Sequence, residues 1–167
     1  MKNIPAVTKS MIDYYAGDPK RIQHFIKVYH FAKMIGEMER VDARTQEILE
    51  VSALVHDIGI KVSEEKYHSS AGKYQELEGP PVAEKLLAGL GCPPPLISRV
   101  CWLVGHHHTY DNIRETDHQI LVEADFLVNA YEDGLTESAI RSVLSKIFRT
   151  PSGKYLLRTI YLKEDGR

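Results

Sequence analysis

The sequence contains little cysteine: only Cys92 and Cys101 occur among its 167 residues. Two cysteines are too few for a disulfide framework, and their separation excludes a CxxC metal or redox motif. Cys101 stands beside Trp102 in an apolar stretch, so we expect it to be a buried core thiol. The cysteines therefore indicate no chemistry and suit a reducing compartment.

The sequence also lacks an excess of charge and any long apolar run. The formal net charge is −2, so no basic surplus is available to neutralise the phosphates of a nucleic acid, although basic residues could still gather around a small anion. The stretch MKNIPAVTKSMIDYYAGDPKR has no apolar region typical of a signal peptide, and no segment approaches the length needed to span a bilayer. We therefore expect a cytoplasmic protein that has neither a nucleic-acid polymer nor a membrane as its partner.

The composition and the apolar pattern indicate one helical domain. With 167 residues, 43% apolar and 26% charged, the chain has the size and composition of a globular protein with a single core. No repeat, low-complexity segment or linker divides residues 1–167. Apolar residues recur at helical spacing, and no stretch shows convincing strand alternation. This pattern predicts an all-α bundle of about six to eight helices, which forms either a monomer or a homodimer.

Capping residues, glycines and prolines predict where the helices begin and end. Asp42 and Thr136 are predicted N-caps, Gly59 is predicted to end the helix that Asp42 begins, and Pro80 and Pro81 are predicted to open another. The polar residues 61–79 are predicted to be irregular and exposed. The expected helices cover residues 6–17, 19–38, 43–59, 80–91, 96–108, 118–134, 137–148 and 154–163.

Four polar residues fall on apolar helix faces: His24, His56, Asp57 and Asp125. A lone histidine on such a face is usually a core residue bonded to a backbone carbonyl, and a lone aspartate is usually half of a salt bridge. Together, two imidazoles and two carboxylates would offer mixed nitrogen and oxygen ligands for a divalent ion such as Mn²⁺, Fe²⁺, Co²⁺, Ni²⁺ or Zn²⁺. A bound dication is the simplest charge that would compensate two buried carboxylates.

Three segments resemble the motifs of the HD-domain superfamily of metal-dependent phosphohydrolases. HFIKVYHFA is similar to the first histidine motif, H-x-x-[RK]-V-x-x-x-A, LVHDIG to the central signature, and LVEADFL to the closing aspartate motif. The resemblance implies a single all-α HD domain whose core motif region covers about residues 20–130, with the C-terminal helices packing on it. It also implies a divalent cofactor (Mn, Fe, Co, Ni, Mg or Zn) held by His24, His56, Asp57 and Asp125.

Two further segments extend the resemblance. His106 and His107 fit an I-x-x-HH segment that holds a second metal or the substrate phosphate in family members, with His108 a weaker candidate; the alternative is an exposed histidine cluster. Glu78 stands where a similar segment, H-x-x-x-G-A-x-x-[IL]-L, has a second-site histidine, so it is a ligand, a water-orienting group or an exposed loop residue. Lys61 comes one residue later than the family's phosphate-binding lysine.

The remaining polar candidates are expected to be structural or exposed. His30 falls off the apolar seam of its helix, and His68 and His118 fall in polar segments that we expect to be loops. Arg149 and Lys154 could meet a phosphate, but an exposed charged turn is the favoured interpretation.

The resemblance implies an enzyme that hydrolyses a phosphate mono- or diester of a small molecule, with a nucleotide as the expected substrate. Metal-activated water would attack the phosphorus, with Asp57, His106 and Lys61 as catalytic residues. Two alternatives remain open at this stage: a di-iron oxygenase of the same fold, and a non-catalytic module that senses a nucleotide. The sequence leaves the substrate, the native metal and the number of metal ions undetermined.

Overall fold

The computed structural model describes residues 4–162, and these residues form nine α-helices and no strand. The all-α class predicted from the sequence is confirmed. The expected last helix reached Lys163, which lies outside the described residues. The helices are α1 (Ile4–Tyr14), α2 (Pro19–Met38), α3 (Ala43–Val55), α4 (Ile60–Tyr67), α5 (Gly72–Gly89), α6 (Pro94–Val104), α7 (Thr116–Glu132), α8 (Glu137–Lys146) and α9 (Pro151–Tyr161).

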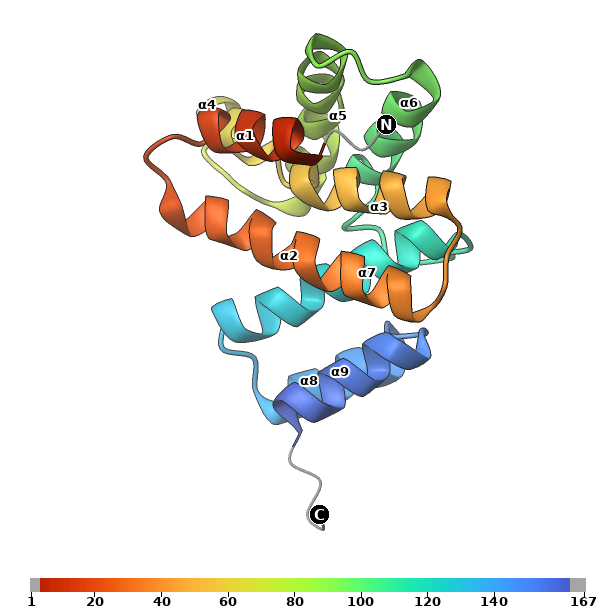
Figure 1. Cartoon of the computed structure of the whole chain (residues 1–167). Coiled ribbons are helices and arrows are strands. Elements are labelled where there is room, and N and C mark those ends of the chain that lie inside the picture. The colour runs from red at the N-terminus through yellow and green to blue at the C-terminus, as the bar shows by residue number, and fades with distance from the viewer. Residues whose placement is uncertain (1–3, 163–167) are drawn as a thin grey trace.

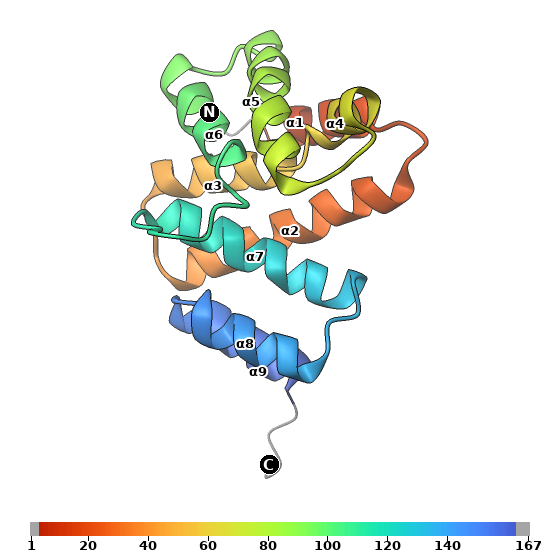
Figure 2. The ribbon, with the colours of Figure 1, turned by 180° about the vertical axis from the view of Figure 1, so that it is seen from behind.

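Three helices form the centre of the bundle. α2 packs against both α3 and α7, and α3 also contacts α7 (Figure 1). The pair α5 and α6 lies on one side of this centre and the pair α8 and α9 on the other, as the reverse view shows (Figure 2). The central position explains why α3 and α7 are buried on nearly all sides, whereas the outer helix α8 buries only Ile140.

The predicted N-caps are confirmed. The Asp42 carboxylate accepts hydrogen bonds from the backbone N–H groups of Arg44 and Thr45, and the Thr136 hydroxyl accepts one from Ala139. Each cap satisfies donors that the first turn of a helix would otherwise leave unpaired. Among the described residues, no helix combines the length and apolarity that crossing a bilayer requires.

The polar segment 61–79 was predicted to be irregular, and this prediction is wrong. It forms α4 and the first half of α5, so Pro80 and Pro81 lie inside a helix instead of opening one. The buried side of α5 consists of Gln75, Gly79, Ala83 and Leu87, which recur every four residues. This stripe gives no hydrophobic signal in the sequence, because its first two members are polar or small. The packing of α5 against α4 and α6 offsets the cost of having prolines inside the helix.

Gly59 does not end α3, as had been predicted. α3 ends at Val55, and Gly59 precedes α4 with an ordinary φ of −76°. Glycine is required here for space, because a Cβ atom would lie 2.6 Å from the backbone nitrogen of Gly79 and 2.8 Å from the carbonyl oxygen of Gln75. The absence of a side chain therefore lets the turn that carries His56 and Asp57 approach α5.

We expect Gly59→Ala to destabilise the protein by about 1–3 kcal/mol, because the added methyl group meets backbone that cannot move aside. The matched control is Gly89→Ala, since nothing lies within 4 Å of a Cβ at Gly89. Urea unfolding of both variants measures the difference. Equal stability of the two variants would contradict the proposed close approach.

The N-terminus of α9 is occupied by a carboxylate from α7. Glu123 is fully buried and accepts hydrogen bonds from the backbone N–H groups of Arg149 at 2.6 Å and Thr150 at 2.9 Å. The guanidinium of Arg149 donates to the carbonyls of Phe148 and Lys146. These contacts support the interpretation of this turn as structural instead of phosphate-binding.

Candidate metal centre

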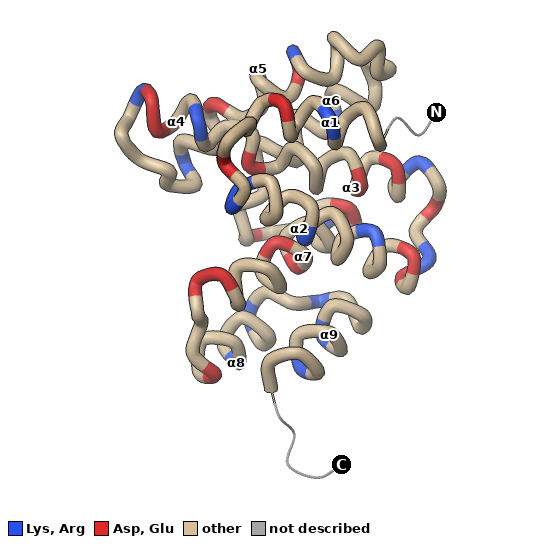
Figure 3. Tube along the Cα trace, turned by 60° about the vertical axis from the view of Figure 1, so that its left-hand side comes forward, with Lys and Arg blue, Asp and Glu red and all other residues tan. Residues whose placement is uncertain are grey.

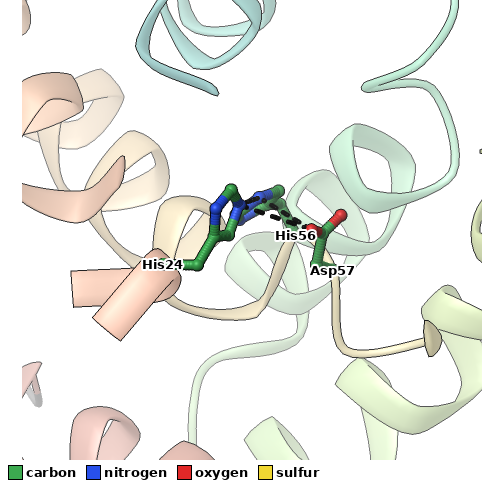
Figure 4. Close-up of side chains that lie close together, drawn as sticks. All are labelled: His24, His56 and Asp57. Carbon is green, nitrogen blue, oxygen red and sulfur yellow. Dashed lines mark hydrogen bonds and ion pairs between the residues drawn. The ribbon is translucent and has the colours of Figure 1, made fainter. Parts of the chain in front are cut away.

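The bundle brings together four side chains that are far apart in the sequence. His24 comes from the second turn of α2, His56 and Asp57 directly follow α3, and Asp125 comes from the middle of α7. Their relative exposures are 7%, 0%, 9% and 4%, so all four belong to the interior. Figure 4 shows His24, His56 and Asp57 directed toward one another.

The reactive atoms of the four residues converge on one point. The two Nε2 atoms of His24 and His56 lie 3.2 Å apart. His24 Nε2 lies 3.4 Å from Asp57 Oδ2 and 3.3 Å from Asp125 Oδ1, and His56 Nε2 lies 3.5 Å from each of these oxygens. The four residues that sequence reasoning proposed as ligands thus face a common centre.

The other ring nitrogens show which tautomers the histidines adopt. His56 Nδ1 lies 2.8 Å from the carbonyl oxygen of Ala53, which can only accept, so Nδ1 carries the proton. His24 Nδ1 lies 3.0 Å from Glu132 Oε2 and donates to that carboxylate in the same way. In the neutral rings, both Nε2 lone pairs therefore point at the centre and at carboxylate oxygens, which are also acceptors.

A cluster of acceptors that face one another needs a cation or a proton between them. The donor set of two imidazole nitrogens and two carboxylate oxygens suits a borderline or hard divalent ion. The outward N–H bonds to a carbonyl and a carboxylate are the outer contacts that metal-bound histidines almost always make. The residues present therefore fit the divalent ion that the sequence predicted.

Neighbouring charges in the cluster raise the pKa of His24 and lower the pKa of Asp125. Burial by itself would lower the pKa of His24, but its hydrogen bond to Asp125 and the charges of Asp125, Asp57 and Glu132 raise that pKa to about 9. Burial would likewise raise the pKa of Asp125, yet its close contacts with His24 and His56 hold that pKa well below its usual range. Without a metal, a proton on His24 thus balances part of the carboxylate charge.

We expect the apparent affinity for Mn²⁺ to rise with pH, because an ion that binds Nε2 must displace the His24 proton. Below a pKa of about 9 that proton is present, so each unit of falling pH should weaken binding about tenfold, whereas the dependence should flatten above about 9. Calorimetric titration with Mn²⁺ at several pH values measures the slope. His30→Gln, a change at an exposed histidine of the same helix, should keep the slope, and an affinity independent of pH would refute the expectation.

His107 and His108 extend the cluster on the side of Asp57. His107 is buried, donates through Nδ1 to the carbonyl of Val104, and places Nε2 3.0 Å from Asp57 Oδ1. Burial lowers the pKa of His107, but the hydrogen bond and charge of Asp57 raise it on balance. His108 Nε2 lies 3.9 Å from the same oxygen, so His108, the weaker candidate in the sequence, lies at the site.

Three residues proposed from the sequence are engaged elsewhere. His106 stacks on Trp102 and places Nδ1 2.7 Å from the carbonyl of Trp102, so it lies outside the cluster. Glu78 binds Lys66 and Tyr67, each at 2.7 Å, on the outer side of α4 and α5. The ammonium group of Lys61 lies over the ring of Tyr14, 5.2 Å from the ring centre. These three positions are corrections, since their sequence spacing did not account for how the helices turn.

Gln75, and not Glu78, contacts a histidine of the site from α5. It is buried on α5 and lies four residues before Gly79, so aligning the H-x-x-x-G part of the family segment on Gly79 would have selected it. Its Oε1 lies 3.0 Å from His108 Nε2. Aligning the segment on Ala83, Leu86 and Leu87 selects Glu78 instead, three residues later and nearly one helical turn away.

The sequence also did not indicate the residues that orient the ligands. Asn129 Nδ2 donates to Asp125 Oδ1 at 2.9 Å, and Tyr15 donates from its hydroxyl to the backbone carbonyl of Asp57 at 3.1 Å. His118, expected in a loop, lies buried in α7 and donates from Nε2 to the carbonyl of His106 at 2.9 Å. Burial lowers the pKa of His118, so it acts as a neutral support for the loop that carries His107.

Glu132 orients His24 from the last turn of α7. Its two oxygens accept from His24 Nδ1 at 3.0 Å and from Lys27 Nζ at 2.6 Å. Burial raises the pKa of Glu132, but the hydrogen bond from Lys27 and the contact with His24 lower it overall, so the carboxylate is ionised. Asn129 and Glu132 lie on the same side of α7 as Asp125, at intervals of three or four residues.

Replacing Glu132 by glutamine is expected to weaken Mn²⁺ binding about 10- to 100-fold, because the amide removes the charge that supports His24 as a ligand. Calorimetric titration of the metal-free protein with Mn²⁺ measures the effect. Glu137→Gln is the control, since Glu137 is exposed and pairs with Arg141 at the start of α8. Unchanged affinity in Glu132→Gln would show that Glu132 does not support the centre.

A polar cavity of about 330 Å³ opens onto the cluster. Lys20, Arg21 and Ser70 belong to its lining, and Phe25 and Ile60 contribute apolar surface. Arg21 is bound by Asp18 and Glu64, which neutralise its charge. The remaining lining residues are His24, Asp57, Gln75, His108, Asn129, Glu132 and Asp133.

The fold and the cluster define a helical protein with a buried centre suited to a divalent metal ion. A family model of the HD domain matches residues 21–141, so the chain belongs to the HD domain family, and the resemblance inferred from the sequence is confirmed. No match was found among the curated proteins.

A solved structure has the same fold. It is the crystal structure of a predicted HD superfamily hydrolase from an uncultured Thermotogales bacterium, which is 22% identical to this chain with a TM-score of 0.66. The similarity covers 92% of this chain and 82% of that chain. At this level of identity, the similarity shows the fold alone.

Proposed function

We propose that the protein is a metal-dependent phosphohydrolase that cleaves a phosphate mono- or diester of a small molecule, with nucleotides as the first substrates to test. The observation that carries the proposal is the convergence of two imidazoles and two carboxylates at the end of a polar cavity. Membership of the HD domain family supports a hydrolytic role, as does the description of the similar solved structure as a predicted hydrolase.

The metal would be held by His24, His56, Asp57 and Asp125. When bound, a divalent ion lowers the pKa of a water molecule and neutralises charge that develops on a phosphoryl oxygen. Ligation by Asp57 Oδ2 would leave Oδ1 paired with His107 Nε2 at 3.0 Å. This pair can take up the proton that a water molecule loses as it attacks phosphorus.

The cavity wall would bind the rest of the substrate. Lys20 is able to donate hydrogen bonds to phosphoryl oxygens, while Phe25 and Ile60 exclude water from the inner part of the cavity. Lys and Arg positions are interspersed with Asp and Glu positions along the chain (Figure 3). This mixed charge supports a small substrate over a nucleic-acid polymer, whose binding depends on a basic surface.

The test is a substrate panel run with protein that has been stripped of metal by a chelator and reloaded with single divalent ions. The panel contains p-nitrophenyl phosphate, its bis-ester, nucleoside monophosphates, cyclic nucleotides and dinucleoside polyphosphates. We expect hydrolysis that depends on the added metal and is lost in Asp125→Asn. The control Asp117→Asn changes an aspartate of the same helix that binds Arg99 instead of the histidines.

The same preparations distinguish the two alternatives. Oxygen consumption by the iron-loaded protein, without phosphate release, would indicate the di-iron oxygenase. Nucleotide binding without turnover of any substrate would indicate the sensor module. Full hydrolysis by the stripped protein would refute a metal-dependent mechanism altogether.

A further inference from the structure

Asp57, His107 and His108 form a second group whose metal-ligating atoms lie within 4.8 Å of one another. Such a group either holds a second ion or donates hydrogen bonds. Which ring nitrogen of His108 carries the hydrogen atom decides between these roles, because only a nitrogen with a free lone pair can bind a metal.

The amide of Gln75 determines where His108 carries its proton. Gln75 Nε2 lies 2.6 Å from the carbonyl oxygen of Ser70, which can only accept, so the amide nitrogen points at Ser70. The amide oxygen Oε1 must then face His108 Nε2, from which it lies 3.0 Å away. Because an amide oxygen also only accepts, His108 Nε2 carries the hydrogen.

The opposite side of the His108 ring is consistent with this assignment. Nδ1 lies 3.3 Å from the hydroxyl of Tyr110, which can donate to its lone pair. The free lone pair of His108 therefore faces Tyr110, while Nε2, the nitrogen nearer Asp57, carries a hydrogen atom that is donated to Gln75 Oε1.

The first turn of α5 prevents the ring from turning over. A Cβ atom on Gly72 would lie 2.8 Å from Cγ of His108, so the ring packs directly on the backbone of α5. The backbone N–H of His108 donates to Glu76 Oε1 at 2.9 Å, and Thr109 Oγ1 donates to the same oxygen at 3.0 Å. Together with Gln75, these contacts hold the loop and the ring in one orientation.

We propose that Gln75 holds the Nε2–H of His108, so that His108 does not act as a metal ligand and the protein holds one metal ion. The number of ions does not rest on the proposed function, because it follows from the contacts that hold Gln75 against Ser70 and His108. A single ion also disfavours the di-iron alternative, which requires two.

The test counts Mn²⁺ ions per chain, by equilibrium dialysis and elemental analysis, in the wild type, Gln75→His and Glu78→His. A histidine at position 75 would replace the acceptor with a metal ligand and release His108 Nε2. Glu78→His is the matched control, since it adds a histidine to the same helix on the side that binds Lys66. We expect one ion in the wild type and in Glu78→His, and two in Gln75→His.

Two ions per wild-type chain would overturn the proposal, and so would a single ion in a folded Gln75→His. If Gln75→His does not fold, nitrogen NMR of His108 in the Zn²⁺-loaded wild type carries the test: a protonated Nε2 supports the proposal, and a bare or metal-bound Nε2 refutes it. Neither measurement uses a substrate. A protein that holds one ion but hydrolyses nothing would therefore refute the proposed function and leave this inference standing.

Discussion

Replacement of Asp57 by alanine is expected to remove both bound metal and hydrolytic activity. Asp57 is the residue that joins the two parts of the site, since Oδ2 faces His24 and His56 while Oδ1 pairs with His107. Loss of an ion that contributes several kcal/mol to the transition state should lower the rate by at least about 1,000-fold. Elemental analysis and hydrolysis of p-nitrophenyl phosphate measure the two effects on the same preparation.

The matched control for this change is Asp133→Ala. Asp133 is an exposed carboxylate that lines the same cavity, so its removal should leave the metal content unchanged. Circular dichroism shows whether each variant keeps its helices. A folded Asp57→Ala that hydrolyses substrate at the wild-type rate in the presence of a chelator would exclude Asp57 from the mechanism.

Loading the metal-free protein with a divalent ion is expected to raise its melting temperature by about 10 °C. An ion at a thousand times its dissociation constant stabilises the folded state by about 4 kcal/mol if the unfolded chain does not bind it, and for a chain of this length each kcal/mol shifts the melting temperature by about 2–4 °C. The physical source is the buried pair Asp57 and Asp125, whose charges the ion compensates. Differential scanning calorimetry with and without Mn²⁺ measures the shift.

Asp125→Asn is the informative variant in this experiment. The amide keeps the shape of the side chain but removes the charge that faces His24 and His56, so the melting temperature should no longer respond to Mn²⁺. Addition of a chelator should reverse the shift in the wild type. An equal response in the wild type and in Asp125→Asn would mean that the ion binds elsewhere.

Much of the fold followed from local patterns. The apolar spacing in residues 19–38 predicted the bounds of α2, and Asp42 and Thr136 predicted helix starts, because capping depends on residues only a few positions apart. The helices of segment 61–79 were missed because a polar stripe gives no hydrophobic signal. The second half of this segment forms the start of α5, which is stabilised by packing against α4 and α6.

The sequence by itself determined which side chains were candidates for the metal centre. His24, His56, Asp57 and Asp125 were recognisable because polar groups on apolar helix faces need a partner, and because their motifs resemble those of the HD domain family. Only the tertiary structure distinguished among the further candidates: His107, with His108 beside it, faces Asp57 while His106 does not, and Gln75 instead of Glu78 contacts His108. The reason is geometric. A shift of three residues moves a side chain about 4.5 Å along α5 and about 60° around it, and adjacent residues in the loop after α6 point in different directions. The packing of α5 on α6 and of α6 on α3 determines which of these side chains reaches the site.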